Sequence, residues 1–485
     1  MNNKFISFII LLFTCAILSC TSDDSFTTSP NHLLTFSTDT IAFDTVFSTV
    51  PTTTKDFWAY NKSGDGIRCT SIRLERGNQS GFRVNVDGTY LGQTSGYQVG
   101  DVEVRNKDSI RIFVELTSPN NYQLEPLKRE DNLVFLLESG AIQKVNLNAF
   151  TWDATILNGL HVKNDTTISG EKPIVIYGGL TVDSLATLTI NAGTTLYFHN
   201  DAGIDVFGKL ICNGTAESNV VLRGDRIDRM FDYLPYDNVS GQWQGITFHT
   251  SSYNNQLTYT DIHSTYHGIT VDSADVNTPK LIMESCTVHN CQGYGIKSDN
   301  AQIYLYNCQL TNTLNDCLLV NGGFAQLDNC TMAQFYPFDS NRGVALRFTS
   351  EHYPLVFRCF NSLVTGYADD ELMGESGEEG NRFDYYFDHC ILRTPKIETE
   401  DSVYLPNVIY EDLKDTVSMG TKHFQNIDTQ MLVYDFSLDS LSAAIDKADP
   451  QTSMPIDRKG VKRDQYPDIG AFEYLKTYNH EEPDN

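Results

Sequence analysis

The residues with the clearest chemical potential form an acidic stretch late in the chain. Its carboxylates are Asp369, Asp370, Glu371, Glu375, Glu378 and Glu379, and the stretch ends at Arg382. Ca²⁺ prefers clustered carboxylate oxygens, so Asp369, Asp370 and Glu371 are the candidate ligands of a calcium ion, and no other cofactor is expected. The stretch has no Asp-x-Asp-x-Asp-Gly spacing of the kind that indicates a preformed calcium loop. A solvated acidic loop without a cation is the alternative.

Aromatic residues accompany this stretch and an earlier polar segment. Sugar rings pack on flat aromatic faces, and arginine offers several hydrogen-bond donors. The candidate glycan-binding residues are therefore Tyr233, Tyr236, Tyr367, Tyr385 and Arg382. Because side chains alternate across a strand, about half of such aromatic residues would face a core, and a structural role is the alternative.

The elements that position these residues are set by a repeated phrase. A small residue with an apolar residue two positions later recurs at positions 260, 286, 308, 330, 362 and 390, in steps of 26, 22, 22, 32 and 28 residues. Apolar residues alternate within each copy, and no helical spacing is sustained. A period near 22 residues with short strands predicts a parallel β-helix, in which successive coils stack roughly 4.8 Å apart. Only the stack of coils is stable, because one coil cannot bury its apolar face.

Cysteines recur within the repeat. The sequence holds 11 cysteines, and Cys15 and Cys20 fall in the expected signal and lipidation region, which leaves an odd number and at least one free thiol. Cys286, Cys308 and Cys330 should lie above one another as a buried thiol ladder. A metal site is the alternative, but spacings of 22 residues do not match the paired cysteines of zinc sites.

Charge and the N-terminal sequence indicate where the protein acts. The formal net charge is −27, which disfavours nucleic-acid binding because the phosphate backbone is repelled.

One lysine and an apolar run from Phe5 to Leu18 precede Ser19-Cys20. This pattern predicts a secretory signal over residues 1–19, too short for a membrane span.

The signal ends in a sequence that resembles a bacterial lipobox. Leu18-Ser19-Cys20 is followed by polar residues, and the resemblance implies cleavage before Cys20 and acylation of its sulfur and amine. Several acyl chains give stable membrane anchoring. We therefore expect an outer-membrane lipoprotein, facing the periplasm or the cell surface, with residues 20–32 as a tether. An ordinary cleaved signal is the alternative.

The rest of the chain divides by pattern. Short strands with turn residues between them over residues 33–152 predict an immunoglobulin-like β-sandwich, in which Cys69 has no disulfide partner. Residues 153–415 carry the repeat and should form the β-helix, interrupted by a loop over 223–240 and by an acidic insertion that follows Val364. Residues 416–485 should be a tail that packs on the last coils and covers unpaired backbone.

Three stretches carry a family resemblance. They are Gln242-Trp243-Gln244-Gly245-Ile246, the Asn-Cys coils, and the ending Pro467-Asp468-Ile469-Gly470-Ala471-Phe472-Glu473-Tyr474. Together they resemble right-handed parallel β-helix lipoproteins of Bacteroidetes, in the broad pectin-lyase-like group. The front module resembles the domain that often precedes such a helix. The resemblance implies an all-β fold and an envelope location, whereas activity varies widely on this fold.

The resemblance also indicates which catalytic motifs to seek. Polygalacturonases of this fold carry paired aspartates, then Gly-His-Gly and Arg-x-Lys, whereas here only Asp316 and His267 come near that pattern, in the wrong order. Inverting hydrolysis needs two carboxyl groups flanking the bond, so we expect His267 to be a turn residue and Asp316 a corner residue bonded to backbone. Lyases of the group use Ca²⁺ and a basic residue, for which Arg347 or Arg382 would be the candidates.

The sequence therefore favours a non-catalytic envelope protein. We expect the β-helix to bind a polysaccharide or another envelope component, with a lipid anchor to the membrane and no nucleic-acid partner. Catalytic residues are not identified. The alternatives are a polysaccharide lyase or glycoside hydrolase with a divergent site in the loops 226–236 and 369–382, and a structural or adhesive spacer.

Overall fold

The chain divides into two compact units. The computed structural model describes residues 25–231, 233–377, 380–398 and 402–475, with one unit ending at Asp153 and the other beginning at Ala154. The predicted signal peptide and the lipidation site Cys20 lie outside the described residues. No helix in the described part of the chain is long and apolar enough to cross a membrane.

The N-terminal unit contains two sheets. The first has the order β1-β3-β9-β5-β6, with bounds Leu34–Phe36, Lys55–Asn61, Ser109–Leu116, Phe82–Val86 and Thr89–Tyr90. The second has the order β2-β11-β10-β4-β7, with β8 also paired to β4; the bounds are Thr40–Phe47, Ile142–Trp152, Leu127–Leu137, Ile67–Leu74, Gln98–Val99 and Val102–Val104. A short 3-10 helix, η1, covers Gln93–Ser95.

The two sheets share one core, as the sequence predicts for a β-sandwich. Alternate residues of each strand are buried, for example Phe57 and Ala59 in β3 and Ile110, Ile112 and Val114 in β9. This alternation places one face of each sheet against the other. Cys69 is buried in the same core and makes no disulfide.

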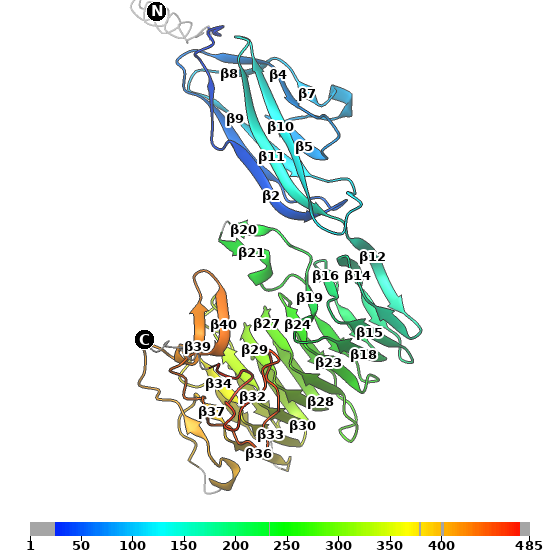
Figure 1. Cartoon of the computed structure of the whole chain (residues 1–485), viewed down its shortest axis with the longest axis vertical. Helices are drawn as coiled ribbons and strands as arrows, with labels where there is room; N and C mark the ends of the chain where they lie inside the picture. Colours follow the sequence, from blue (N-terminus) through cyan, green and yellow to red (C-terminus); the bar gives the residue numbers. More distant parts are fainter. Residues whose placement is uncertain (1–24, 232, 378–379, 399–401, 476–485) are drawn as a thin grey trace, which may run out of the picture. The chain divides into compact units, whose positions relative to one another are not determined.

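The second unit is a stack of coils with three faces, each a column of parallel strands (Figure 1). Face 1 begins with β12 and β14, two long strands that also run into face 2. The later strands of face 1 belong to that face alone. The face 1 bounds are β12 Thr155–Val162, β14 Ile174–Val182, β16 Thr195–Phe198, β19 Val220–Gly224, β24 Thr260–His263, β27 Thr287–Cys291, β29 Gln309–Thr313, β31 Thr331–Gln334, β34 Leu363–Gly366, β37 Ile391–Leu392 and β38 Ile409–Tyr410.

Faces 2 and 3 complete each coil and share the long strands β28 and β30. Face 2 continues with β17 Ile204–Val206, β22 Ile246–Phe248, β25 Ile269–Val271, β28 Ile296–Tyr306, β30 Leu318–Asp328, β32 Leu346–Thr349 and β35 Leu372–Glu375. Face 3 also contains β13 Thr166–Ile168, β15 Thr187–Asn191, β18 Lys209–Asn213, β23 Asn255–Thr258, β26 Leu281–Glu284, β33 Leu355–Phe360 and β36 Phe383–Asp388. The predicted parallel β-helix is confirmed.

The repeated phrase marks the corner between faces 3 and 1. The residue before each small residue has a left-handed backbone, with φ of 43° at Tyr259, 53° at Ser285, 51° at Asn307, 51° at Asn329, 49° at Asn361 and 49° at His389. Asparagine tolerates this conformation better than most residues because its short polar side chain bonds locally. The corner therefore explains why Asn-Cys recurs in the sequence.

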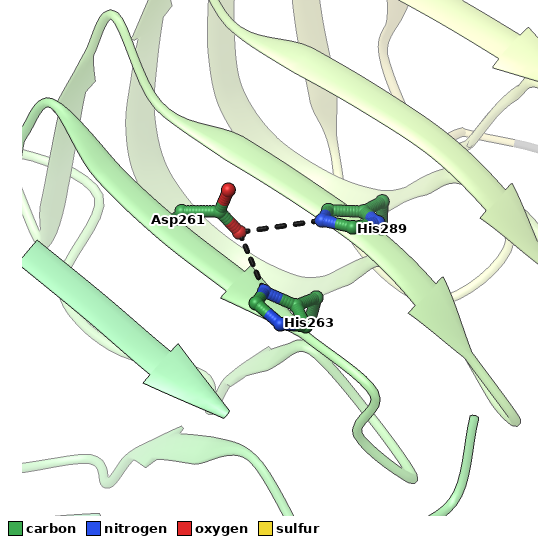
Figure 2. Close-up of side chains that lie close together, drawn as sticks. All are labelled: Asp261, His263 and His289. Carbon is green, nitrogen blue, oxygen red and sulfur yellow. Dashed lines mark hydrogen bonds and ion pairs between the residues drawn. The ribbon is translucent and has the colours of Figure 1, made fainter. Parts of the chain in front are cut away.

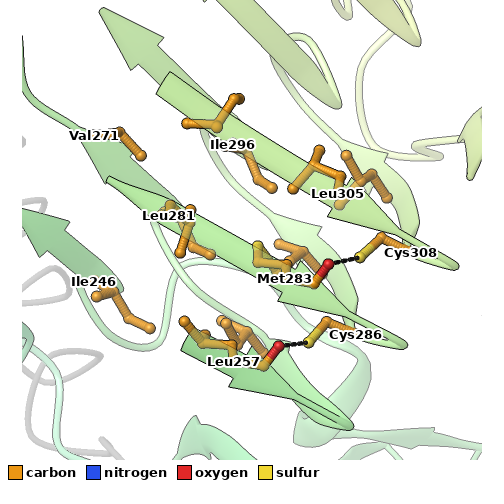
Figure 3. Close-up of a cluster of buried hydrophobic side chains, with 14 of the residues drawn as sticks. Ile246, Leu257, Val271, Leu281, Met283, Cys286, Ile296, Leu305 and Cys308 are labelled. Atoms are coloured by element: carbon orange, nitrogen blue, oxygen red, sulfur yellow. Dashed lines mark hydrogen bonds between the residues drawn. The ribbon is translucent and has the colours of Figure 1, made fainter. Parts of the chain in front are cut away.

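The cysteines that follow the corner form the predicted thiol ladder. Each Sγ donates to a face 3 carbonyl of the preceding coil. Cys286 donates to Leu257 at 3.2 Å and Cys308 to Met283 at 3.7 Å (Figure 3). Cys330 donates to Leu305 at 3.3 Å. All three side chains are fully buried and none is in a disulfide. Burial raises the pKa of Cys286 and Cys308 well above the ordinary value, which keeps these thiols neutral and unreactive.

The acidic insertion is shorter than the sequence suggests. Strand β35 pairs with β32, and β36 pairs with β33, so residues 372–375 and 383–388 belong to the coils. The described residues 376–377 and 380–382, between β35 and β36, belong to no strand. The prediction of an insertion beginning after Val364 is wrong because the glycine and acidic residues of β35 hide its pairing with the coil before it.

The tail packs on the late coils and also runs back along earlier ones. Phe424, Phe436 and Ile469 share a second core with Leu363 and Ile391. Further on, tail residues bond corner side chains of successive coils: Asp449 N to Asn361 Oδ1 at 2.8 Å, Met454 N to Asn329 Oδ1 at 2.9 Å and Arg463 Nη2 to Asn307 Oδ1 at 3.1 Å.

Several short elements of the described chain lie off the stack. The hairpin β39–β40, with bounds Phe424–Asp428 and Val433–Leu438, belongs to the tail and follows the 3-10 helix η4 (Thr421–His423). A smaller pair, β20 (Arg229–Phe231) and β21 (Leu234–Pro235), leads into η2 (Tyr236–Asn238). The helix η3 covers Ser402–Tyr404. The expected loop over 223–240 thus leaves the stack after β19, and its end positions η2 beside face 1.

Candidate functional site

A polar groove lies on face 1, between the coils and the tail. Its volume is about 460 Å³, and we call it the polar groove. The lining residues are Asn238, Asp261, Thr287, His289, Asn290, Gln309, Asn312, Leu432, Tyr434, Asp435, Phe436, Arg458, Lys459 and Phe472. The floor comes from β24, β27 and β29, one wall from the hairpin β39–β40 and the other from the end of the tail.

The floor is polar because of strand alternation. Ile262, Val288 and Leu310 face the core and are fully buried. The residues on either side of them point outward, so the register places His263 beside His289 and Asp261 beside Thr287. Three successive coils, about 4.8 Å apart, therefore place equivalent side chains one above another in columns.

Two histidines and an aspartate converge at this floor (Figure 2). His263 Nδ1 lies 2.7 Å from Asp261 Oδ1, and His289 Nε2 lies 3.3 Å from the same oxygen. The two imidazole rings are stacked with centroids 4.8 Å apart. Among the described residues, this is the one group of three His, Cys, Asp or Glu side chains whose ligand atoms all lie within 4.8 Å of one another.

A second carboxylate orients His263 from the other side. The Nε2 of His263 lies 2.7 Å from Asp237 Oδ1, and the Nη2 of Arg223 lies 2.8 Å from the same oxygen. Burial lowers the pKa of His263, but the charge of Asp261 and the bonds to both carboxylates outweigh burial and raise this pKa to about 9. Without another cation, His263 is therefore an imidazolium that donates to both carboxylates.

Burial by itself raises the pKa of Asp261, but the neighbouring His263 and His289 outweigh burial and hold this pKa well below the ordinary value. The same balance, with His263 and Arg223 as partners, lowers the pKa of Asp237. Both carboxylates are therefore ionised at neutral pH. The cluster therefore contains several charged groups close together, and two of its side chains, Asp261 and His289, line the groove.

The groove floor also carries buried amides. Asn290 and Asn312 follow the two outward residues of β27 and β29 and have φ of 53° and 57°. Asn312 is 1% exposed, and its side-chain oxygen has no hydrogen-bond partner in the described part of the chain. Buried carbonyl oxygens are normally satisfied, so this atom is an unmet hydrogen-bond acceptor at the groove floor.

The predicted glycan-binding residues lie in three places. Tyr233 is exposed near β21 and stacks with Phe231, and Tyr236 in η2 lies under the guanidinium of Arg226 at 3.6 Å. Tyr367 packs edge-on against Phe335 in the second core.

The other two predicted glycan-binding residues lie near face 3. Tyr385 lines a smaller cavity of about 300 Å³ together with Phe348 and Phe383. Arg382 is exposed and pairs with Asp384. The structure therefore does not assemble these five residues into one surface.

The three predicted calcium ligands also diverge. Asp369 is exposed and lies 3.4 Å from Arg393, and Asp370 accepts a bond from Thr394 Oγ1 at 2.7 Å. Glu371 is buried and accepts from the backbone N–H groups of two residues, Ala345 at 3.0 Å and Ala368 at 2.7 Å.

Burial raises the pKa of Glu371 to about 8, against the two N–H donors that lower it. The Glu371 side chain therefore stabilises the turn between β34 and β35 through these hydrogen bonds. Calcium at this stretch stays a prediction that the geometry of the described residues does not support.

Two other sequence predictions concern single residues. Asp316 accepts from Val344 N at 2.9 Å and from Arg347 Nε at 3.0 Å, which confirms its place as a corner residue bonded to backbone. His267 accepts from Tyr294 N at 3.1 Å, as expected of a turn residue.

The converging histidines were missed in the sequence, although the repeat contains the signal. Aligning the copies on Thr260 and Cys286 places His263 and His289 at the same position, three residues later in each copy. Asp237 cannot be found this way, because it reaches the site from the loop between β19 and β22, outside the repeated phrase. The predicted site residues lie in dense acidic and aromatic stretches, whereas the converging histidines are sparse and share only their position within the repeat.

A comparison with known protein families supports the fold of the second unit. A family model described as right handed beta helix region matches residues 157–350, so the β-helix is of the right-handed type. No curated protein matches the chain. No activity follows from the match to the family model alone.

Among solved structures, pectate lyase Pel9A is 11% identical with a TM-score of 0.32, covering 67% of this chain and 88% of its own. The catalytic unit of a GH87 α-1,3-glucanase from Streptomyces thermodiastaticus is 10% identical with a TM-score of 0.25, covering 69% and 79%. A family 123 glycoside hydrolase from Clostridium perfringens is 6% identical with a TM-score of 0.17. The match covers 25% of this chain and 26% of that hydrolase.

Proposed function

We propose that the polar groove binds a saccharide chain. Its lining combines amides, hydroxyls and charged groups of both signs with the aromatic side chains of Tyr434, Phe436 and Phe472. Sugar hydroxyls both donate and accept hydrogen bonds, and a sugar ring also offers an apolar face. A lining that supplies all three kinds of contact suits such a ligand better than a purely apolar molecule.

The observation that carries this proposal is the unpartnered side-chain oxygen of Asn312. Leaving a buried acceptor unsatisfied costs about 1–3 kcal/mol, so a ligand that donates to it regains that free energy. Asn312 lies on the groove floor beside Asn290 and Gln309. Together these amides form a polar row across two coils that an extended ligand can follow.

Charge favours a neutral or weakly charged saccharide. The groove contains Asp261 and Asp435 as well as Arg458 and Lys459, so its own charges are close to balanced. The chain as a whole carries −27, which repels a highly anionic polymer over the range of the Debye length.

Replacing Asn312 with alanine should weaken saccharide binding about 5- to 100-fold, because a ligand hydroxyl loses a buried acceptor. A glycan array with the purified protein identifies the ligand, and titration calorimetry then compares the variant with the wild type. Asn321→Ala is the matched control: its side-chain oxygen is also unpartnered, but it lies on β30 outside the groove lining. Equal affinities for wild type and Asn312→Ala would contradict the proposal.

A polysaccharide lyase or hydrolase is the second candidate. The observation that favours it is the chain Asp237–His263–Asp261 beside His289, in which ionised and imidazole groups meet at the groove. General acid–base catalysis uses such groups when they reach the substrate. Release of unsaturated uronides or new reducing ends from a bound polysaccharide would establish catalysis, whereas binding without product excludes it for that substrate.

We also propose that the protein is a lipoprotein of the outer membrane, in which the β-sandwich follows the anchor along the chain and the β-helix follows the β-sandwich. Support comes from the apolar run and Leu18-Ser19-Cys20 in the sequence. Mass spectrometry of the N-terminal peptide, from protein purified out of a bacterial envelope, should find residue 20 as the first residue, carrying acyl chains. An unmodified cysteine, or a chain that begins elsewhere, would overturn this proposal.

A further inference from the structure

We propose that Asp261, His263 and His289 bind a divalent transition-metal ion of the zinc type. The candidate ligand atoms already lie close together: Asp261 Oδ1 is 2.7 Å from His263 Nδ1 and 3.3 Å from His289 Nε2. Zinc bonds of about 2.0–2.1 Å in a tetrahedron place neighbouring ligands roughly 3.3 Å apart. Only small side-chain shifts are therefore needed to surround an ion.

The position of Asp237 gives independent support. Metal-binding histidines commonly donate their second ring N–H to a carboxylate, which fixes the tautomer and the ring orientation. Here the Nε2 of His263 lies 2.7 Å from Asp237, so its N–H can be donated there and Nδ1 is left for the ion. Arg223 in turn holds Asp237 at 2.8 Å.

The coils hold the ligands rigidly. Asp261 and His263 lie on β24, and His289 lies on β27, in a register fixed by the paired strands. Below them, the indole Nε1 of Trp243 donates to the carbonyl of His263 at 2.8 Å. Ligands on paired strands over a packed core need little reorganisation before an ion binds.

The ligand types select the ion, and the groove supplies the open side. Imidazole nitrogens suit zinc, copper, iron or nickel, whereas calcium and magnesium prefer oxygen ligands. Asp261 and His289 both line the polar groove. Three protein ligands with one position open to a groove is the arrangement of catalytic rather than structural zinc sites, so a metal-bound water would face the saccharide site.

Another histidine in the stack provides a matched comparison. His249 lies between two carboxylates, 2.8 Å from Asp205 and 3.3 Å from Asp272. It has carboxylate neighbours like those of His263 but no second histidine converging with it among the described residues. Its two ring nitrogens face different carboxylates, so it should bind zinc weakly.

The test is a zinc titration of the chelator-treated full-length protein, followed by calorimetry. We expect one Zn²⁺ per chain, and Co²⁺ should give the visible absorption of a low-coordinate site. His289→Ala should weaken zinc binding at least 10-fold, and Asp237→Asn should weaken it about 10- to 100-fold. His249→Ala should leave affinity unchanged. His289 is half-buried at the groove, so its loss should spare the fold, which circular dichroism checks.

Two results would overturn the inference. They are the absence of stoichiometric Zn²⁺ binding in the wild type, and equal zinc affinity in His289→Ala and the wild type. The titration contains no saccharide, so it is independent of the proposed glycan binding. Repeating the saccharide titration in the presence of a chelator separates zinc binding from saccharide binding. Zinc binding can fail while saccharide binding persists, and saccharide binding can fail while zinc binding persists.

Discussion

Replacing Trp243 with alanine should lower the free energy of unfolding by about 3–5 kcal/mol, the usual cost of removing a large aromatic side chain from a core. Trp243 is fully buried and stacks on Phe198, with ring centroids 4.3 Å apart and planes 10° apart. Its indole also donates to the carbonyl of His263. The variant therefore loses packing and leaves a buried carbonyl without its donor.

The measurement is urea denaturation followed by far-ultraviolet circular dichroism. Trp243→Phe is the first control, because it keeps most of the stacked area and loses only the hydrogen bond, at a cost of about 1–3 kcal/mol. Trp58→Ala is the second, since Trp58 is only partly buried and lies in the N-terminal unit. A loss below about 1 kcal/mol for Trp243→Ala would mean that this side chain does not fill the core as described.

Arg393→Ala should also lower the free energy of unfolding by about 3–5 kcal/mol, because it removes one of the two basic partners of the buried Glu411 and leaves only His423, at 3.3 Å. Arg393 is fully buried, and Nη1 lies 3.3 Å from Glu411, whose side chain is 2% exposed. Its Nε donates to the carbonyl of Ala368 at 2.7 Å. The guanidinium, which directly follows β37, thus joins the turn before β35 to the residue after β38.

The matched control for this prediction is Arg382→Ala. Arg382 is exposed at 63% and pairs with Asp384 at the surface, and surface pairs contribute at most about 1 kcal/mol. The double variant Arg393→Ala, Glu411→Ala should recover part of the loss, since the buried carboxylate is then removed together with its arginine partner. Equal stability of Arg393→Ala and Arg382→Ala would contradict the buried ion pair.

The fold was predictable because the coil repeats its constraints. Each turn must supply inward apolar residues, a left-handed corner and a small residue after it, and so Asn307-Cys308 and Asn329-Cys330 recur visibly in the sequence. The thiol ladder followed from the same period. Strand β35 was misread as insertion because its glycine and acidic residues resemble a loop, although pairing with β32 determines its conformation.

The groove was much less predictable, because three distant segments build it. The floor comes from the coils, Asp237 and Asn238 arrive from the loop after β19, and Arg458 comes from the tail. A tail returning along the coils has no sequence period to reveal its path. The aromatic residues chosen from the sequence, such as Tyr367 and Tyr385, largely serve cores instead.

Hydrogen–deuterium exchange with and without the saccharide tests most directly whether the polar groove is the binding site. Binding there should slow exchange in peptides covering β27, β29 and β40, which supply the floor and one wall. Peptides from β36 and from the N-terminal unit should exchange as before. Protection confined to β36 or to the N-terminal unit, with β27 and β29 unchanged, would contradict the assignment of the polar groove.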